Sequence, residues 1–374
     1  MEYQVLLVES DRLMLERLAN VIKETIGFKL AARYQSPSDA LGQGAVFNPN
    51  LILLDIENNP ISTLEDFKKV YPGISIVCMG EHWQADTASH LVRSGARGYL
   101  MKPFTSNELI KSLETFNRIS LEGHSQVITF FSPKGKSGKT TLLSNLAVSL
   151  ARKTGEPIGI IDADLQFGDM AVFFNVEPKS TIVEAVRDID FLSPVSLNGY
   201  FVPVTEKISL LCGTRTPNLS DKVEIDPFLS LLTMAKSLFR YVLVDVPQGF
   251  CPISIAAAEA SDLTYVVAMV NGGYEVRHVQ RALQIFDDWE DASDRVKTVF
   301  TRVNPCDASS QRFLEDNLER PVEAIIPNEY VMVSAAADNG HMALDLEPGS
   351  QLAMSINLLA DRLLGRKQIR WDEL

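Results

Sequence analysis

The sequence predicts two α/β domains, each a doubly wound parallel sheet, and two observations carry this prediction. Short apolar runs alternate with amphipathic helical segments along most of the chain, which is the pattern of a parallel sheet covered by helices on both faces. The alternation is interrupted once, at "SLEGHSQ" (120–126), a glycine-containing stretch without apolar period that is typical of a linker. We therefore predict domains at residues 1–122 and 123–374.

The first domain should contain five strands and five helices in strict alternation. The expected strands are 3–9, 29–34, 51–57, 74–80 and 98–103. The expected helices are 12–27, 36–47, 63–71, 84–95 and 106–119. This order predicts a (βα)5 sheet.

The second domain should contain a larger sheet of the same kind. The expected strands are 127–132, 157–165, 207–214, 241–247, 263–270, 296–303 and 322–327. A helix should follow the first of these strands directly, and a last helix within 354–371 should cover the sheet. That last segment also carries Arg362, Arg366, Lys367 and Arg370, so a helix lying on an anionic membrane is the alternative.

Composition excludes several classes of protein. The 374 residues are 46% hydrophobic and 22% charged, as in globular proteins. Four cysteines without paired spacing argue against a disulfide framework or a zinc site. A net charge of -13 disfavours nonspecific binding to nucleic acid, because phosphates are repelled. No apolar run reaches the ~20 residues of a membrane-spanning helix, and the N-terminus does not have the pattern of a secretory signal.

The stretch "SPKGKSGKTTLLSNLA" (132–147) has the strand, glycine turn and helix of a phosphate-binding loop. Backbone N–H groups and the helix N-terminus attract phosphate oxygens there. Lys139 should reach the β- and γ-phosphates, and the Thr140 hydroxyl should bind Mg²⁺. The residues expected around ATP are Gly135, Lys136, Ser137, Gly138, Lys139, Thr140 and Thr141.

A second lysine in this loop, Lys134, resembles the signature lysine of the deviant Walker A motif, K-G-G-x-G-K-[ST], of the MinD/ParA family of ATPases. In that family the lysine reaches across a face-to-face dimer to the partner's nucleotide. The resemblance, over roughly residues 126–365, implies a homodimer bridged by ATP and released by hydrolysis. Lys136 stands where the family has its second glycine, so we expect weak hydrolysis.

Two acidic strand ends should lie close to this loop, because parallel strands end at the same edge of a sheet. "GIIDADL" resembles the family's switch I, in which Asp164 matches the aspartate that positions the attacking water and Asp162 the acidic residue before it. "YVLVDVPQG" resembles a Walker B strand, in which Asp245 would bind Mg²⁺. Gln248 replaces a residue that is small in the family, which is a second reason to expect slow hydrolysis. By the same resemblance, Asn304 and Pro327 would contact the adenine.

The first domain resembles the CheY-like receivers of response regulators. Asp55 matches their phosphoacceptor, Lys102 the lysine that pairs with the phosphate, and Glu9 the first residue of their acidic pair. The second acidic residue is replaced by Ser10, and Asp11, one residue further on, is the alternative ligand. Met79 occupies the usual Ser/Thr position. Since phosphorylation of a carboxylate needs a metal to offset converging negative charge, we expect a pseudo-receiver used for docking or dimerisation.

A receiver-like domain ahead of a MinD/ParA-type ATPase is the architecture of the TadZ/CpaE family of tight-adherence (Flp-type) pilus proteins. This resemblance implies a cytoplasmic factor at the cell pole that positions and assembles the pilus machinery. Its partners would be a pilus secretion ATPase and inner-membrane assembly proteins, with indirect membrane association and no specific nucleic acid. Two alternatives stay open: a chromosome-partition or division-site positioning ATPase, and a response regulator whose phosphorylation controls an ATPase.

Overall fold

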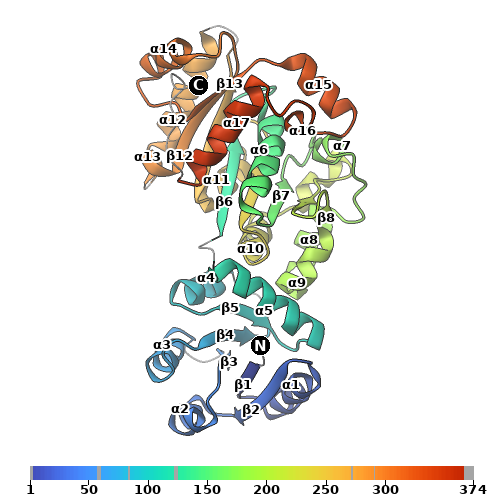
Figure 1. Cartoon of the computed structure of the whole chain (residues 1–374), viewed down its shortest axis with the longest axis vertical. Coiled ribbons are helices and arrows are strands. Elements are labelled where there is room, and N and C mark those ends of the chain that lie inside the picture. Colours follow the sequence, from blue (N-terminus) through green and yellow to red (C-terminus); the bar gives the residue numbers. More distant parts are fainter. Residues whose placement is uncertain are drawn as a thin grey trace. The chain divides into compact units, whose positions relative to one another are not determined.

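The computed structural model describes residues 3–56, 60–82, 85–121, 125–270, 273–289 and 291–365. Within them the chain forms two compact units, each with its own β-sheet, and Figure 1 labels their elements. Each unit is described by itself. The predicted boundary between residues 122 and 123 lies outside the described residues, so the two domain ranges stay predictions.

The first sheet has five parallel strands in the order β2-β1-β3-β4-β5. These are β1 (Tyr3–Val8), β2 (Phe28–Tyr34), β3 (Leu51–Asp55), β4 (Ser75–Gly80) and β5 (Gly98–Met101). The helices are α1 (Arg12–Glu24), α2 (Pro37–Gln43), α3 (Pro60–Val70), α4 (Ala85–Arg93) and α5 (Ser106–Leu121), with a 3₁₀ turn η1 (Gly44–Phe47). All ten expected elements occur in the expected order, which confirms the doubly wound architecture.

Helices cover this sheet closely enough that all five residues of β3 are buried. The apolar face of α1, with Leu15, Leu18 and Ile22, packs into the same core. The chain crosses in opposite directions from β1 to β2 and from β2 to β3, so the strand order reverses between β1 and β3. Glu9 and Asp55 lie at the carboxyl ends of these two strands, where doubly wound sheets bind ligands.

The second sheet has eight strands in the order β13-β12-β11-β6-β10-β7-β9-β8. These are β6 (Gln126–Phe131), β7 (Ile158–Asp162), β8 (Val202–Pro203), β9 (Ile208–Leu211), β10 (Tyr241–Asp245), β11 (Leu263–Met269), β12 (Val296–Val303) and β13 (Ala324–Pro327). All neighbours are parallel except β8 and β9. The seven predicted strands are confirmed. β8 was not predicted, because two residues with a proline at a sheet edge carry no periodic signal.

The helices that follow α5 occur in chain order between and after these strands. They are α6 (Lys139–Thr154), α7 (Met170–Phe173), α8 (Ile182–Arg187), α9 (Pro194–Leu197), α10 (Ile225–Ala235), α11 (Pro252–Ala260), α12 (Tyr274–Phe286), α13 (Ala292–Arg295), α14 (Ala308–Leu318), α15 (Tyr330–Asp338), α16 (Ala343–Leu346) and α17 (Gln351–Leu363). Three 3₁₀ turns complete the set: η2 (Ile189–Phe191), η3 (Asn198–Tyr200) and η4 (Pro217–Lys222).

The helix α6 is the central helix of the second core, with every residue from Leu142 to Leu150 buried. It is covered in turn by α17, which packs against α6 and β13 (Figure 1). Ile356 and Leu359 of α17 are fully buried. The prediction that the C-terminal segment covers the sheet is therefore confirmed. The basic residues Arg366, Lys367 and Arg370 lie outside the described residues.

The strand β6 marks the switch point of the second sheet. From β6 the chain moves to β7 and β9 on one side, and after β10 it continues to β11, β12 and β13 on the other. The carboxyl ends of β6, β7 and β10 therefore lie where ligands bind to such sheets. In the described parts of the chain, no helix has the length and apolar character needed to cross a bilayer.

Candidate functional site

A glycine-containing loop connects β6 to α6, and two side-chain hydrogen bonds fix its shape. The Ser132 hydroxyl donates to the Lys134 carbonyl oxygen at 2.5 Å. The Thr301 hydroxyl, on β12, donates to the Ser137 carbonyl oxygen at 2.6 Å. Gly138 has a φ of 80° and stands at the N-cap of α6, a conformation that glycine adopts without strain. The N-terminus of α6 thus faces a preformed turn, which suits a phosphate group.

Lys136 has a left-handed backbone, with a φ of 62°. Its side chain is exposed. The left-handed region brings the β-carbon of an L-residue close to the carbonyl oxygen, which costs about 1–2 kcal/mol. The sequence therefore places a lysine at a loop position whose conformation favours glycine, and this is where the MinD/ParA motif has its second glycine.

We expect Lys136→Gly to be more stable than Lys136→Ala by about 1 kcal/mol, because both lose the charge but only glycine relieves the left-handed strain. Thermal unfolding of the two nucleotide-free variants measures this difference. Lys136→Arg is the control that keeps the charge and the strain, and it should unfold like the wild type. Equal stability of the glycine and alanine variants would contradict the strained backbone.

Asp245, at the end of β10, contacts two residues of the first turn of α6, Lys139 and Thr140. Its Oδ2 accepts a hydrogen bond from the Thr140 hydroxyl at 2.7 Å. Its Oδ1 lies 3.9 Å from Lys139 Nζ. Burial raises the pKa of Asp245 to about 6, and the nearby Lys139 and the Thr140 hydrogen bond oppose this rise. The three residues that the sequence assigned to phosphate and metal binding therefore lie together.

One oxygen of the Asp245 carboxylate is suited to binding Mg²⁺. Its Oδ1 is buried and accepts no hydrogen bond from the described residues, which is unusual for a buried polar atom. Mg²⁺ prefers oxygen ligands and is commonly held by one or two protein oxygens beside substrate phosphates. Thr140 Oγ1 and the Asp245 carboxylate fit that donor set.

The two carboxylates that follow β7 differ in their surroundings. Asp162 is buried and accepts hydrogen bonds from the backbone N–H groups of Met170, at 3.3 Å, and Asp164, at 3.2 Å. Burial and the nearby Asp245 raise the pKa of Asp162 well above its usual value. Asp162 thus holds the turn after β7 in shape. Asp164 is only partly buried, and its Oδ1 accepts from the Phe167 N–H at 3.3 Å, so it is more accessible to a ligand.

A pocket lies beside the first turn of α6, at the carboxyl ends of β12 and β13. Its lining includes Thr141 and Pro327, both of which the sequence assigned to the nucleotide. It also includes three residues that the sequence analysis missed: Arg302, Asn328 and Tyr330. Asn328 directly follows Pro327, and its amide offers the donor and acceptor that a base edge needs. Asn304 is exposed and does not line this pocket, so its contact with a base stays a prediction.

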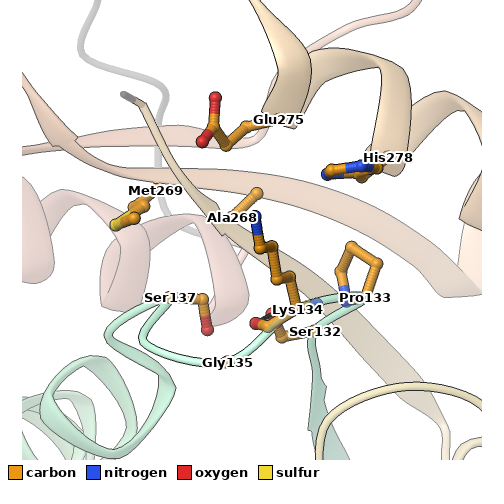
Figure 2. A pocket seen from close by; sticks show the side chains of 9 residues that line it. All are labelled: Ser132, Pro133, Lys134, Gly135, Ser137, Ala268, Met269, Glu275 and His278. Carbon is orange, nitrogen blue, oxygen red and sulfur yellow. Dashed lines mark hydrogen bonds between the residues drawn. The ribbon is translucent and has the colours of Figure 1, made fainter. Parts of the chain in front are cut away.

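The side chain of Lys134 lies in a different pocket, on the α12 side of the loop. Figure 2 shows it extending from the loop toward α12, which carries Glu275 and His278. Gly135 lines the same pocket. Lys134 is exposed and has no ion pair within the described residues. Its ammonium group is thus available to a ligand or to a second chain.

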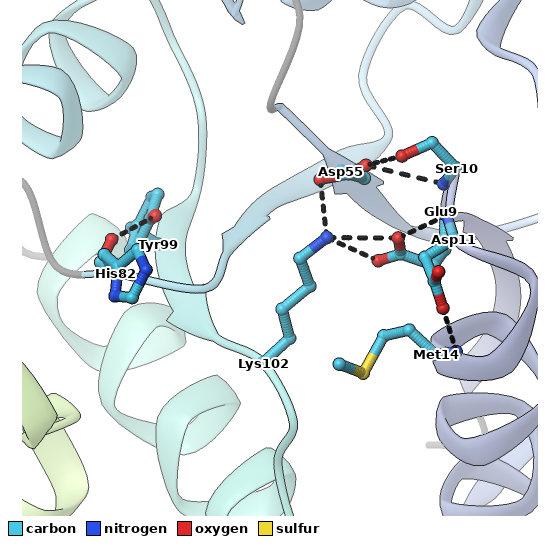
Figure 3. Close-up of polar contacts among 8 residues, drawn as sticks. All are labelled: Glu9, Ser10, Asp11, Met14, Asp55, His82, Tyr99 and Lys102. Carbon is cyan, nitrogen blue, oxygen red and sulfur yellow. Dashed lines mark hydrogen bonds and ion pairs between the residues drawn. The ribbon is translucent and has the colours of Figure 1, made fainter.

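The predicted receiver residues form one buried ion cluster (Figure 3). Lys102 Nζ lies 2.8 Å from Glu9 Oε2 and 2.9 Å from Asp55 Oδ1. The side chains of Lys102 and Glu9 are 0% exposed. Burial raises the pKa of Glu9, although its hydrogen bond to Lys102 lowers it. Burial alone would lower the pKa of Lys102, but its hydrogen bonds to Glu9 and Asp55 outweigh this and raise it.

The residues that depart from the receiver pattern also have defined contacts. The Ser10 hydroxyl donates to Asp55 Oδ2 at 2.7 Å, so both oxygens of Asp55 accept hydrogen bonds from the protein. Asp11 Oδ1 accepts from the Met14 N–H at 2.7 Å and caps α1. Met79 pairs with Asp55 in the sheet register and is fully buried. Asp11 therefore acts as the N-cap of α1, and Met79 supplies no hydroxyl group beside Asp55.

Two family models match separate parts of the chain. The model described as the response regulator receiver domain matches residues 5–114. The model described as the CobQ/CobB/MinD/ParA nucleotide binding domain matches residues 128–341. An uncharacterized ATP-binding protein of Methanocaldococcus jannaschii is 25% identical over 249 residues, which cover 64% of this chain and 88% of that protein. The chain spans about half or less of several other curated relatives.

Many solved structures have a fold similar to that of part of this chain. A ParA family ATPase from Chlorobium tepidum has a TM-score of 0.59 and 20% identity, and the match covers 63% of this chain and 98% of that one. The septum site-determining protein MinD of Pyrococcus horikoshii, complexed with Mg-ADP, has a TM-score of 0.54 and 18% identity, over 64% and 96%. The nucleotide binding model covers more than half of the sequence. The chain therefore belongs to the CobQ/CobB/MinD/ParA nucleotide binding domain family, with a receiver domain ahead of it.

Proposed function

We propose that this chain binds ATP with Mg²⁺, hydrolyses it weakly, and forms a homodimer in the ATP-bound state. The main observation behind this proposal is that Thr140 and Lys139 contact the buried Asp245, next to the glycine-containing loop between β6 and α6. Family membership supports it, as does the Mg-ADP bound to the MinD of similar fold.

Each residue has a defined part in the proposed reaction. A water oxygen forms a bond to the γ-phosphorus, and the bond from that phosphorus to the β,γ-bridging oxygen breaks. The electron pair stays on ADP, and both protons of the water leave with the phosphate as H₂PO₄⁻. Lys139 offsets charge on the phosphates, and Asp164 positions the water. Lys134 would neutralise phosphate charge on the nucleotide bound to the second chain of the dimer. Mg²⁺, held by Thr140 and Asp245, would neutralise the charge that develops on the phosphate oxygens.

We further propose that the protein positions and assembles a tight-adherence pilus machinery, as in the TadZ/CpaE family. The support is the order of the domains, a receiver followed by a MinD/ParA-type ATPase. The protein would then lie in the cytoplasm at the cell pole, reaching the membrane through a pilus secretion ATPase and inner-membrane assembly proteins. The receiver, with Asp55 bound by Lys102 and Ser10, would serve as a pseudo-receiver for docking or dimerisation.

Trapping the ATP-bound form tests the biological role. We expect Asp164→Ala to bind ATP without turning it over, and its capture from native cells to recover a pilus secretion ATPase. Lys139→Ala, which should not load ATP, is the matched control for partners that bind regardless of nucleotide. Recovery of a centromere-binding or division protein instead would keep the ATPase and overturn the pilus role.

The two alternatives differ from this proposal in measurable ways. A partition or division-site ATPase is compatible with the same family and fold. A working response regulator would require labelling of Asp55 by acetyl phosphate, lost in Asp55→Asn. The hydrogen bonds on both Asp55 oxygens favour the pseudo-receiver.

A further inference from the structure

The turn that follows β10 places a glutamine on the phosphate-type loop. A β-carbon added at Gly135 would lie 2.2 Å from Oε1 of Gln248 and 3.2 Å from its Cδ. The carboxamide therefore rests directly on the backbone of Gly135. Glycine at position 135 is what allows this approach, because any side chain there would displace the amide.

The turn itself is held firmly. The Gly249 N–H donates to the Ser132 carbonyl oxygen at 2.8 Å, which ties the turn to the first residue of the loop. The ring of Phe250 packs at 4.7 Å from that of Phe131 and at 5.4 Å from that of Phe286, measured between centroids. The backbone that follows Gln248 is thus anchored to the loop and to the core, which keeps this residue beside the loop before any ligand binds.

The carboxamide of Gln248 has unused hydrogen-bonding capacity. The side chain is exposed, and the structure gives it no hydrogen bond to any described residue. An amide carries two donors and an acceptor. It also lies only three residues after Asp245, the carboxylate that contacts Thr140 and Lys139. The amide lies against Gly135, in the loop whose backbone N–H groups would hold the phosphates of a nucleotide.

We propose that Gln248 is a further catalytic residue that contacts the terminal phosphoryl group of ATP through its NH₂ and the attacking water through its Oε1. The inference rests on the proposed ATP site. It assigns to Gln248 the discrimination between a nucleoside triphosphate and a diphosphate. Other P-loop NTPases use a glutamine amide to orient the attacking water.

Affinities for ATP and ADP, measured by calorimetry on the full chain with Mg²⁺, test this assignment. We expect Gln248→Ala to lower the preference for ATP over ADP by about tenfold, the effect of losing one hydrogen bond to a charged group. Affinity for ADP should not change. Gln248→Glu should lower ATP affinity further, because a carboxylate repels the terminal phosphate. Gln43→Ala, an exposed glutamine of the first unit, should leave both affinities unchanged.

These measurements distinguish a wrong assignment of Gln248 from a wrong assignment of the ATP site itself. An unchanged ratio in Gln248→Ala, or an equal loss for ATP and ADP, would overturn the assignment while leaving the ATP site intact. A wild-type protein that binds neither nucleotide would overturn the proposed ATP site and the assignment with it. Hydrolysis in Gln248→Ala should fall together with the ATP preference.

Discussion

Replacing Lys139 with alanine should reduce ATP hydrolysis at least about a hundredfold, the usual cost of removing one group that stabilises charge in a transition state. Lys139 Nζ lies 3.9 Å from Asp245 Oδ1, so the variant also loses a cation beside a buried carboxylate. Lys139 lowers the pKa of Asp245, which is about 6. In Lys139→Ala this pKa should rise, and more of Asp245 should be protonated and unable to bind Mg²⁺ at neutral pH. Phosphate release with Mg-ATP measures the effect.

A matched control separates this effect from a general loss of positive charge. Lys179→Ala removes an exposed lysine outside the loop and should hydrolyse ATP at the wild-type rate. Thermal unfolding should show that both variants are folded. Hydrolysis in Lys139→Ala at the wild-type rate would mean that the loop between β6 and α6 is not the site of the reaction.

The sequence predicted both sheets because buried parallel strands are continuous apolar runs, a local signal. It also predicted that Thr140, Lys139 and Asp245 come together. Parallel strands of a doubly wound sheet end at the same edge, so the topology alone predicts that residues far apart in sequence meet there. These elements depend on pattern and topology alone.

Other features depended on contacts that no local pattern encodes. Arg302 and Asn328 line one pocket because β12 and β13 pair side by side, which the sequence does not reveal. The sequence offers Asp11 as an alternative metal ligand, but in the structure its carboxylate caps α1. An aspartate before a helix suits both roles, and only the structure decides between them. Lysine itself does not indicate the left-handed backbone of position 136; only the glycine that the family motif has there points to it.

Replacing Lys102 with methionine should destabilise the first unit by about 3–5 kcal/mol, the cost of removing one partner from a buried ion pair. Methionine keeps much of the volume and removes the cation paired with Glu9 and Asp55. Hydrogen exchange, followed peptide by peptide, measures the loss of stability in each of the two units separately. Peptides of β1, β3 and α1 should exchange faster, and peptides of β10 and α6 provide the internal reference.

The loss should also depend on pH in a defined direction. Burial raises the pKa of Glu9, and Lys102 lowers it, so the pKa should rise further in Lys102→Met. A carboxyl group whose pKa is higher in the folded state stabilises the fold at low pH, and this contribution is lost as the pH rises through the folded pKa. The variant should therefore lose more stability at about pH 8 than at about pH 5.

Arg33→Met is the matched control, because it removes the cation of an exposed pair with Glu16 in the same unit. It should cost less than about 1 kcal/mol and show little dependence on pH. Equal losses in the two variants would mean that the Lys102 cluster behaves like a surface ion pair. A large loss confined to Lys102→Met would show that the residues matching a phosphorylation site serve the stability of this receiver, which is what a pseudo-receiver requires.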